Sequence, residues 1–353
     1  MTSSHMNSMQ RVLKTLSHQE PDRVPVFLCV TMHGAKELGL TIEEYFSKAE
    51  NVAEGQLRMR KKYDHDCLYP FFYGSIEIEA WGGEVVFHDD GPPNSGLPFL
   101  KSLNNIKGLQ PPRVMECRRL LEVLKTLALL KERVVDEVPL IGVVMSPFSV
   151  PVMQMGFDNY IELIYEYHGL FEQLMRVNEE FCVEWANAQL AAGATAICYF
   201  DPVSSPTIIP RDLYLKTGFP IANSTLSRIK GPTATHFSSG ICLPILSDVV
   251  ATGTAIVSAS VTEDLAETKA ACKGKLTVLG NLNGIEMRRW TVQHAEKMVK
   301  DAIAKAGAGG GFILSDNHGE IPWQVPDEVL IAISDAVYKW GQYPLNWIND
   351  YAG

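Results

Sequence analysis

Short runs of apolar residues recur along the chain, and many of them are rich in the β-branched and aromatic residues that favour strands. Eight candidate strands follow from this pattern: residues 24–30, 65–72, 139–145, 194–200, 233–239, 254–260, 275–281 and 310–316. Continuous apolar runs of this kind are typical of strands that are buried on both faces. The pattern therefore predicts a parallel sheet covered by helices.

Segments with a helical spacing of apolar residues lie between most of these runs from the third onward, and the clearest spans residues 160–193. Repeated strand and helix units in this number predict an α/β fold, a (β/α)8 TIM barrel that forms a single domain over residues 1–353. A doubly wound open sheet is the alternative. Such a sheet usually carries a glycine-rich phosphate turn after its first strand, and residues 30–39 contain no such turn.

An insertion of about residues 74–136 separates the second and third predicted strands. Residues 81–99 are rich in glycine and proline, so they cannot form one continuous helix. We expect an arm that consists of a hairpin followed by a helix over residues 112–134. Glu77 and Glu79 fall on one face of a segment interpreted as extended, and the arrangement favours a solvated edge of the arm over an acid/base pair.

Composition narrows the classes of partner. The chain has 353 residues, 46% of them apolar, and a net charge of −10, which disfavours nucleic acids and anionic membranes. The sequence has no apolar run long enough to span a bilayer and no apolar segment near its start, so we expect a cytoplasmic protein. Seven scattered cysteines without a C-x-x-C pair argue against disulfides. The expected partner is a small molecule or another protein.

Polar residues follow several predicted strands at the end where barrel enzymes keep their active sites. Asp201 follows the fourth strand, His236 lies in the fifth and His318 follows the eighth. Histidine is a common zinc ligand, and a catalytic zinc site needs three protein ligands and one open position. We therefore treat His236, His318 and Asp201 as candidate metal ligands and catalytic residues; the alternative is that each only caps a turn.

The remaining residues at these strand ends are mostly aromatic or thioether-bearing, which indicates a largely apolar pocket with a few polar groups. The candidate substrate-binding residues are Met32, His33, Tyr69, Phe71, Phe72, Met145, Phe148, Tyr199 and Ser238.

Several stretches resemble the uroporphyrinogen decarboxylase superfamily, and together they cover nearly the whole chain. They are PDRVPV (21–26), IEIEAWGGEV (76–85), AAGATAICYFDPVSSP (191–206), PTATHFSSG (232–240), LGNLNG (279–284) and FILSDNHGEIPWQVPDE (312–328). The segments around DPVSSP and PTATHFSSG are most similar to the branch that transfers methyl groups to or from corrinoid proteins. The resemblance implies a TIM barrel.

The sequence departs from both branches of this superfamily. The decarboxylases carry arginines after the first strand, whereas residues 27–40 contain only Lys36 as a basic residue, so an acidic tetrapyrrole would lack its counter-charges. The methylcobamide:coenzyme M methyltransferases bind zinc through H-x-C on the fifth strand and a later cysteine. His236, Ser238 and His318 stand at the matching positions, which implies a harder, more Lewis-acidic zinc.

A Lewis-acidic zinc suits the cleavage of a methyl ether. The resemblance therefore implies a methyltransferase that moves a methyl group from a methoxylated substrate to the Co(I) of a corrinoid, and the aromatic residues at the strand ends indicate an aromatic substrate. No D-x-H-x-x-G motif occurs in the chain, so the corrinoid is expected on a partner protein. Three alternatives stay open: methyl transfer from a corrinoid to a thiol or folate, a metal-free lyase using His318 and Asp201 as acid and base, and a non-catalytic binding module.

Overall fold

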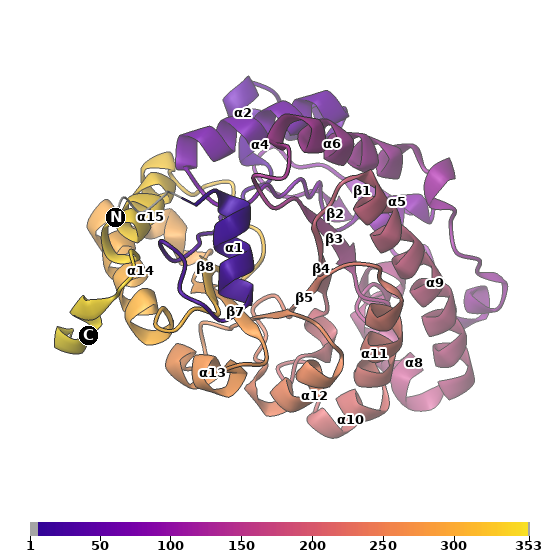
Figure 1. Cartoon of the computed structure of the whole chain (residues 1–353). Helices are drawn as coiled ribbons and strands as arrows, with labels where there is room; N and C mark the ends of the chain where they lie inside the picture. Colours follow the sequence, from indigo (N-terminus) through magenta and orange to yellow (C-terminus); the bar gives the residue numbers. More distant parts are fainter. Residues whose placement is uncertain (1–5, 352–353) are drawn as a thin grey trace.

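A ring of strands surrounded by helices forms the body of the computed structural model, which describes residues 6–351 (Figure 1). The strands of the ring are β3 (Ile141–Met145), β4 (Ala196–Phe200), β5 (Thr233–His236), β6 (Ile256–Ser258), β7 (Thr277–Leu282) and β8 (Phe312–Asp316), and a separate hairpin contains β1 (Val85–Val86) and β2 (Asn94–Ser95). The α-helices are α1 (Ser8–Leu16), α2 (His33–Leu38), α3 (Ile42–Phe46), α4 (Ala49–Tyr63), α5 (Ile76–Ala80), α6 (Arg118–Val134), α7 (Pro151–Met155), α8 (Phe157–Glu166), α9 (His168–Ala192), α10 (Arg211–Lys216), α11 (Gly218–Arg228), α12 (Leu246–Ala251), α13 (Leu265–Cys272), α14 (Val292–Ala306) and α15 (Asp327–Trp340). The short 3-10 helices are η1 (Leu103–Gly108), η2 (Val114–Glu116), η3 (Pro202–Ser204), η4 (Leu243–Ile245), η5 (Glu286–Arg289) and η6 (Asn346–Asp350).

Strands β3 to β8 pair in parallel and in chain order. The first two predicted strands, residues 24–30 and 65–72, close the ring as extended segments that make one bridge each. Val26 pairs with Leu314 of β8, and Leu68 pairs with Leu140 just before β3. The prediction of a TIM barrel is confirmed, but these two segments are not full strands, and each contains a proline that cannot donate to a ladder.

Side-chain amides replace the missing backbone bonds around these two segments. Gln56 of α4 donates to the carbonyl of Val30 at 3.1 Å and accepts from the amide of Tyr69 at 2.9 Å. Gln189 of α9 exchanges two hydrogen bonds with the backbone of Val143 in β3. Buried backbone groups without partners are costly, so these glutamines stabilise the half of the barrel where strand pairing is sparse.

A buried ion network fastens helix α1, which covers the N-terminal end of the barrel (Figure 1). Arg11 contacts both Asp22 and Asp66 at 2.7 Å, and Arg23 contacts Asp66 at 2.6 Å. Asp66 also accepts from the amide of Val26 at 3.0 Å. Because a buried charge needs a partner, this network accounts for the charges of the PDR segment and for an aspartate at the start of a buried strand segment.

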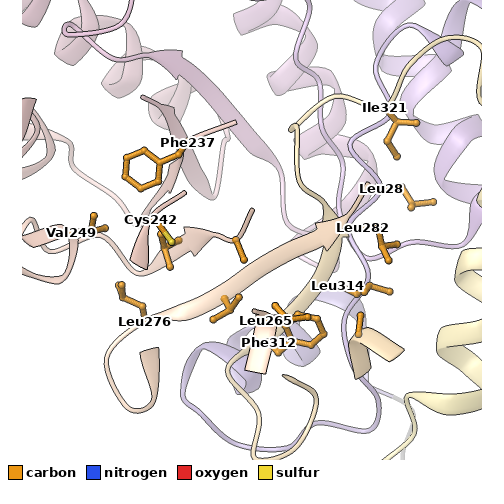
Figure 2. Packing of buried hydrophobic residues seen from close by; sticks show 14 of the residues in the cluster. Leu28, Phe237, Cys242, Val249, Leu265, Leu276, Leu282, Phe312, Leu314 and Ile321 are labelled. Atoms are coloured by element: carbon orange, nitrogen blue, oxygen red, sulfur yellow. The ribbon is translucent and has the colours of Figure 1, made fainter. Parts of the chain in front are cut away.

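Two apolar layers fill the inside of the barrel. The layer next to α1 contains Val12, Phe27, Cys67, Ala234, Ile256, Leu279 and Ile313. The layer nearer the C-terminal ends of the strands contains Cys29, Tyr69, Val143, Cys198 and Phe200. A larger cluster packs the outside of the strands against the helices, and Figure 2 shows part of it, including Leu282 of β7 and Leu314 of β8.

The inserted arm has the predicted hairpin and the predicted later helix, α6, which packs between α4 and α9 in the outer ring. The prediction for the first part of the arm is wrong, because Glu77 and Glu79 lie on helix α5 and not on an extended segment. Glu77 is buried, and its Oε1 accepts from the amide of Met145 at 2.8 Å. Burial raises the pKa of Glu77 to about 8. Only Glu79, paired with Arg119, keeps a partly exposed position.

None of the helices in residues 6–351 has the length and hydropathy needed to cross a bilayer.

Candidate active site

A cavity of about 310 Å³ lies at the C-terminal ends of the barrel strands. The strand ends and loops contribute Phe71, Gly74, Ser75, Met145, Phe200, Ser238, His318, Gly319 and Glu320, helix α7 contributes Met153, and the arm contributes Pro92, Pro93, Asn94 and Ser95. The arm is tied across to the loop after β8, because Gln324 Nε2 donates to the carbonyl of Asp90 at 2.7 Å. The cavity therefore has the position of a barrel active site and an arm that covers part of it.

The register of the strands places three side chains at the same level along the barrel axis. Met145, Phe200 and His236 are paired neighbours at the ends of β3, β4 and β5. Phe200 points into the barrel, where its ring lies 6.3 Å from that of Phe71 with planes that differ by 13°. On its other side the ring of His236 stacks at 4.6 Å. The cavity thus has an aromatic wall that the barrel register holds in place.

His236 is buried behind this wall, and the turn that follows holds its ring. Ser238 has a φ of 55°, a left-handed conformation that a non-glycine residue seldom adopts. This conformation directs the amide of Ser238 back to His236 Nδ1, to which it donates at 3.0 Å. Burial, with the nearby His318, lowers the pKa of His236 to about 3. The ring is therefore neutral, and because Nδ1 accepts a hydrogen bond, its one proton is on Nε2.

The loop after β8 places a second histidine at the cavity. Asp316 Oδ2 accepts from the amides of His318 and Gly319 at 2.8 and 2.7 Å, which shapes the turn. The Nδ1 of His318 contacts the hydroxyl of Ser239. Burial lowers the pKa of His318 as well. Gly319 has a φ of 82° and a side chain there would collide with Phe200, so this position requires glycine.

Several buried polar atoms at this end of the barrel have no hydrogen-bond partner within the protein. They are Tyr69 Oη, His236 Nε2, Asp316 Oδ1, both amide atoms of Asn317, and His318 Nε2. Buried polar groups without partners are rare in folded proteins and often mark functional sites, where a ligand or water completes them.

These residues as placed do not fit a resident zinc ion. Asp201 Oδ1 accepts hydrogen bonds from Ser146 at 2.5 Å and Ser149 at 2.8 Å, so this carboxylate is committed to the loop after β3. The proton on Nε2 of His236 occupies the lone pair that a metal would need. Of the three predicted ligands, His318 is the one whose buried Nε2 has no hydrogen-bond partner and whose tautomer its contact with Ser239 leaves open. Across residues 6–351, no three His, Cys, Asp or Glu side chains are grouped as a metal site requires.

Glu320 is the carboxyl group that lines the cavity. It contacts the hydroxyl of Thr31, which follows the first extended segment. Burial raises the pKa of Glu320 to about 7, and the contact with Thr31 opposes this shift. A carboxyl group with a pKa near neutrality can donate or accept a proton at physiological pH.

The structure places several candidate substrate-binding residues away from the cavity. Phe71, Met145 and Ser238 line it, and Tyr69 lies in the layer of barrel side chains below. The following residues instead pack between strands and helices or beneath loops: Met32, His33, Phe72, Phe148 and Tyr199. His33 is fully buried near Trp323, and burial lowers its pKa to about 3. None of these five residues is among those that line the cavity.

The alternation of side chains along a strand explains why some predicted residues do not line the cavity. Tyr199 and Phe200 are adjacent and therefore point to opposite faces of β4. The tyrosine faces the helices and the phenylalanine faces the cavity. Sequence reasoning also missed Met153, Glu320 and the arm residues Pro92 to Ser95. The sequence could have indicated Glu320, because it is an acidic residue two positions after His318 in a loop at the active end of the barrel. Nothing in the local pattern indicated Met153 or the arm, because both reach the cavity through tertiary packing.

Comparison with known proteins agrees with this architecture. The sequence model of the uroporphyrinogen decarboxylase (URO-D) family matches residues 7–340. The chain is 25% identical over 282 residues to a methylcobamide:CoM methyltransferase from Methanosarcina barkeri, which covers 77% of this chain and 81% of that protein. It is 22% identical to uroporphyrinogen decarboxylase from Idiomarina loihiensis, over 94% of this chain and 95% of that protein. The solved structure of a methyltransferase from Methanosarcina mazei shares the fold, with a TM-score of 0.83 at 22% identity, and covers 95% of this chain and 99% of that one. The chain therefore belongs to the uroporphyrinogen decarboxylase family.

Proposed function

We propose that this protein is a methyltransferase that takes a methyl group from a methoxylated aromatic substrate and passes it to the Co(I) of a corrinoid held by a partner protein. The observation that carries the proposal is the cavity at the barrel mouth, whose lining combines an aromatic wall with a single carboxyl group, Glu320. The similarity to a methylcobamide:CoM methyltransferase supports methyl transfer over the decarboxylation performed by other family members.

The aromatic wall suits an aromatic ring. Phe71 and Phe200 line the cavity with rings that are nearly parallel to each other, and Met145 and Met153 add polarisable thioethers. Aromatic contacts of this kind add about 0.5–1.5 kcal/mol each beyond the burial of apolar area. His236 acts as a positioning residue, because it stacks behind Phe200 and keeps that ring in place. Asp201 positions the loop after β3 in the same indirect way, through its two serines.

The bound corrinoid would supply a strong nucleophile that accepts the methyl group. As the bond between methyl carbon and ether oxygen breaks, its electron pair stays on the oxygen, which becomes a phenolate. Glu320 lies in the cavity wall and can transfer its proton to that oxygen, so that the product leaves as a neutral phenol. The arm residues over the cavity limit the access of water, which strengthens every electrostatic interaction inside it.

Zinc was the Lewis acid expected at the ether oxygen from the family resemblance. We assign no step to it, because His236 and Asp201 are not in the state that metal ligation needs. In this proposal Glu320 and His318, which both line the cavity, take the role at the leaving oxygen. The zinc of the sequence-based hypothesis stays a prediction that metal analysis tests.

The partner has to approach the open side of the cavity, and apolar side chains are exposed there. Leu97 of the arm is 82% exposed, and Ile208 and Ile285 follow β4 and β7 with exposures of 44% and 43%. Ile208 and Ile285 lie on segments that follow the C-terminal ends of barrel strands, and Leu97 comes two residues after Ser95, which lines the cavity. Exposed apolar groups that surround a pocket are typical of a protein-binding surface.

Two other functions are less favoured by the same cavity. Decarboxylation of a tetrapyrrole with several carboxylates needs basic side chains, and of the described residues none that lines the cavity is a lysine or arginine. Methyl transfer to a thiol benefits from a thiolate-ligated metal, whereas the chain has serine at the H-x-C position.

The test is an anaerobic mixture of purified protein, free cob(I)alamin and a panel of methoxyarenes, followed by absorbance for methylcobalamin. We expect methylcobalamin and the matching phenol in equal amounts. Methyl transfer from methylcobalamin to a thiol, with no reaction of any methoxyarene, would instead support a methyltransferase that passes the methyl group from a corrinoid to a thiol.

A further inference from the structure

The charges around the cavity restrict its ligand. Of the fourteen residues that line it, Glu320 is the only acidic one, and none of these described residues is a lysine or arginine. Glu320 contacts the hydroxyl of Thr31, and Asp316 accepts from two backbone amides, so among the described residues neither carboxyl group is paired with a lysine or arginine.

Acidic residues also lie near the part of the arm that lines the cavity. Asp89 and Asp90 are exposed and stand shortly before the lining prolines, and the carbonyl of Asp90 accepts a hydrogen bond from Gln324 of the loop after β8. Lys36, the basic residue of the segment after the first strand, contacts the carbonyl of Trp323 and lies over its ring at 4.3 Å. It is not among the side chains that line the cavity.

We infer that the methyl donor is an uncharged methoxyarene and that the site rejects methoxyarenes with a carboxylate on the ring. The inference rests on the proposed function and adds the charge class of its substrate. A carboxylate that enters this cavity loses its water and finds neither an arginine nor a lysine, and an unpaired buried charge is strongly unfavourable. Substitution of the ring with neutral groups carries no such cost.

The test compares two donors of nearly equal size, a methoxyphenol with a para carboxamide and the same compound with a para carboxylate. Turnover is measured with free cob(I)alamin, and binding of both compounds is measured by calorimetry. We expect kcat/KM and affinity to be about 100-fold lower for the carboxylate, because its charge is buried without a partner. Equal binding of the two compounds overturns the inference.

A designed counter-charge provides a second experiment. Met153→Lys places an ammonium on an unbranched side chain of similar length in the cavity wall, and Met153→Leu is its neutral control. We expect the ratio of carboxylate to carboxamide affinity to rise about tenfold in Met153→Lys, as one paired charge allows, and to stay low in Met153→Leu. An unchanged ratio in both variants contradicts the inference. If the neutral donor binds but yields no methylcobalamin, the proposed function fails while the charge preference is still decided by binding.

Discussion

The amide of Ser238 donates a hydrogen bond to Nδ1 of His236 at 3.0 Å. The contact depends on the left-handed backbone of Ser238, which turns the chain back on the histidine. It keeps the proton of the neutral imidazole on Nε2, so this ring is a hydrogen-bond donor at its buried end and not a metal ligand. A position that resembles half of a zinc motif therefore has a different chemical state in this chain.

We accordingly expect the purified protein to keep little zinc after dialysis against a chelator, and to keep its methyltransferase activity. Metal analysis and turnover of the same sample provide the measurement. Ser238→Cys is the matched variant, because it restores a thiolate at the H-x-C position and is expected to retain more zinc. Stoichiometric zinc in the unmodified protein, with activity lost on its removal, would show that the histidine changes its hydrogen bonding to bind metal.

Glu320 is expected to act on the leaving oxygen. Glu320→Gln preserves size and polarity but cannot release a proton, so we expect kcat to fall about 100-fold, a typical contribution of general acid catalysis. The loss should shrink with a methoxyarene whose phenol is made more acidic by a cyano group, because such an oxygen leaves without a proton. Glu328→Gln, at an exposed position of α15, is the control. An equal loss for both donors would assign Glu320 a structural role only.

The exposed apolar residues around the cavity are expected to contact the corrinoid protein. Leu97→Asp introduces a charge into this surface, and we expect the KM for the corrinoid protein to rise about tenfold, as one disrupted central contact does. The control is Leu13→Asp, because Leu13 is 55% exposed on α1 at the opposite end of the barrel. Steady-state kinetics with varied corrinoid protein measure both. Equal effects of the two substitutions would contradict docking at the cavity.

The buried network around Asp66 is expected to dominate the stability of the N-terminal end. Asp66→Ala leaves Arg11 and Arg23 buried without their shared partner. Removing one partner of a buried ion pair typically lowers the free energy of unfolding by about 3–5 kcal/mol. Chemical denaturation of the variant measures the change in free energy of unfolding. Glu54→Ala removes an exposed ion pair with Arg58 and should cost less than about 1 kcal/mol. A small effect at Asp66 would mean that water enters this region.

Glu77 is expected to make stability depend on pH. Its pKa is raised from 4.5 to about 8 by burial, so between these values the folded protein holds a proton that the unfolded chain has lost. The free energy of unfolding therefore falls as pH rises through this window, by up to about 1.4 kcal/mol per pH unit. Glu77→Gln keeps an acceptor for the Met145 amide and removes the titration. We expect the variant to gain stability over the wild type as pH rises, in denaturation at about pH 5 and about pH 8. Glu162→Gln, exposed on α8, should follow the wild-type pH dependence throughout.

The order of strands and helices was determined by the sequence alone, because apolar runs and helical spacing are local patterns that survive in the linear chain. The same pattern placed His318, Met145 and Ser238 at the active end of the barrel, since in a parallel barrel every strand ends at the same face. The family motifs pointed to the same fold. Each of these features depends on short stretches of residues.

Tertiary structure decided which side of each strand faces the cavity. A strand buried on both faces has no polar side to mark its orientation, so Phe200 and Tyr199 were indistinguishable until the barrel closed around one and the helices around the other. Glu320 lines the cavity and contacts Thr31, which lies at the other end of the chain, and that contact was not visible in the sequence. The proton position on His236 was also invisible in the sequence, because it depends on a backbone turn at Ser238. The residue types were visible in the sequence, whereas the strand face, the backbone turn and the contacts between distant segments that set their roles were not.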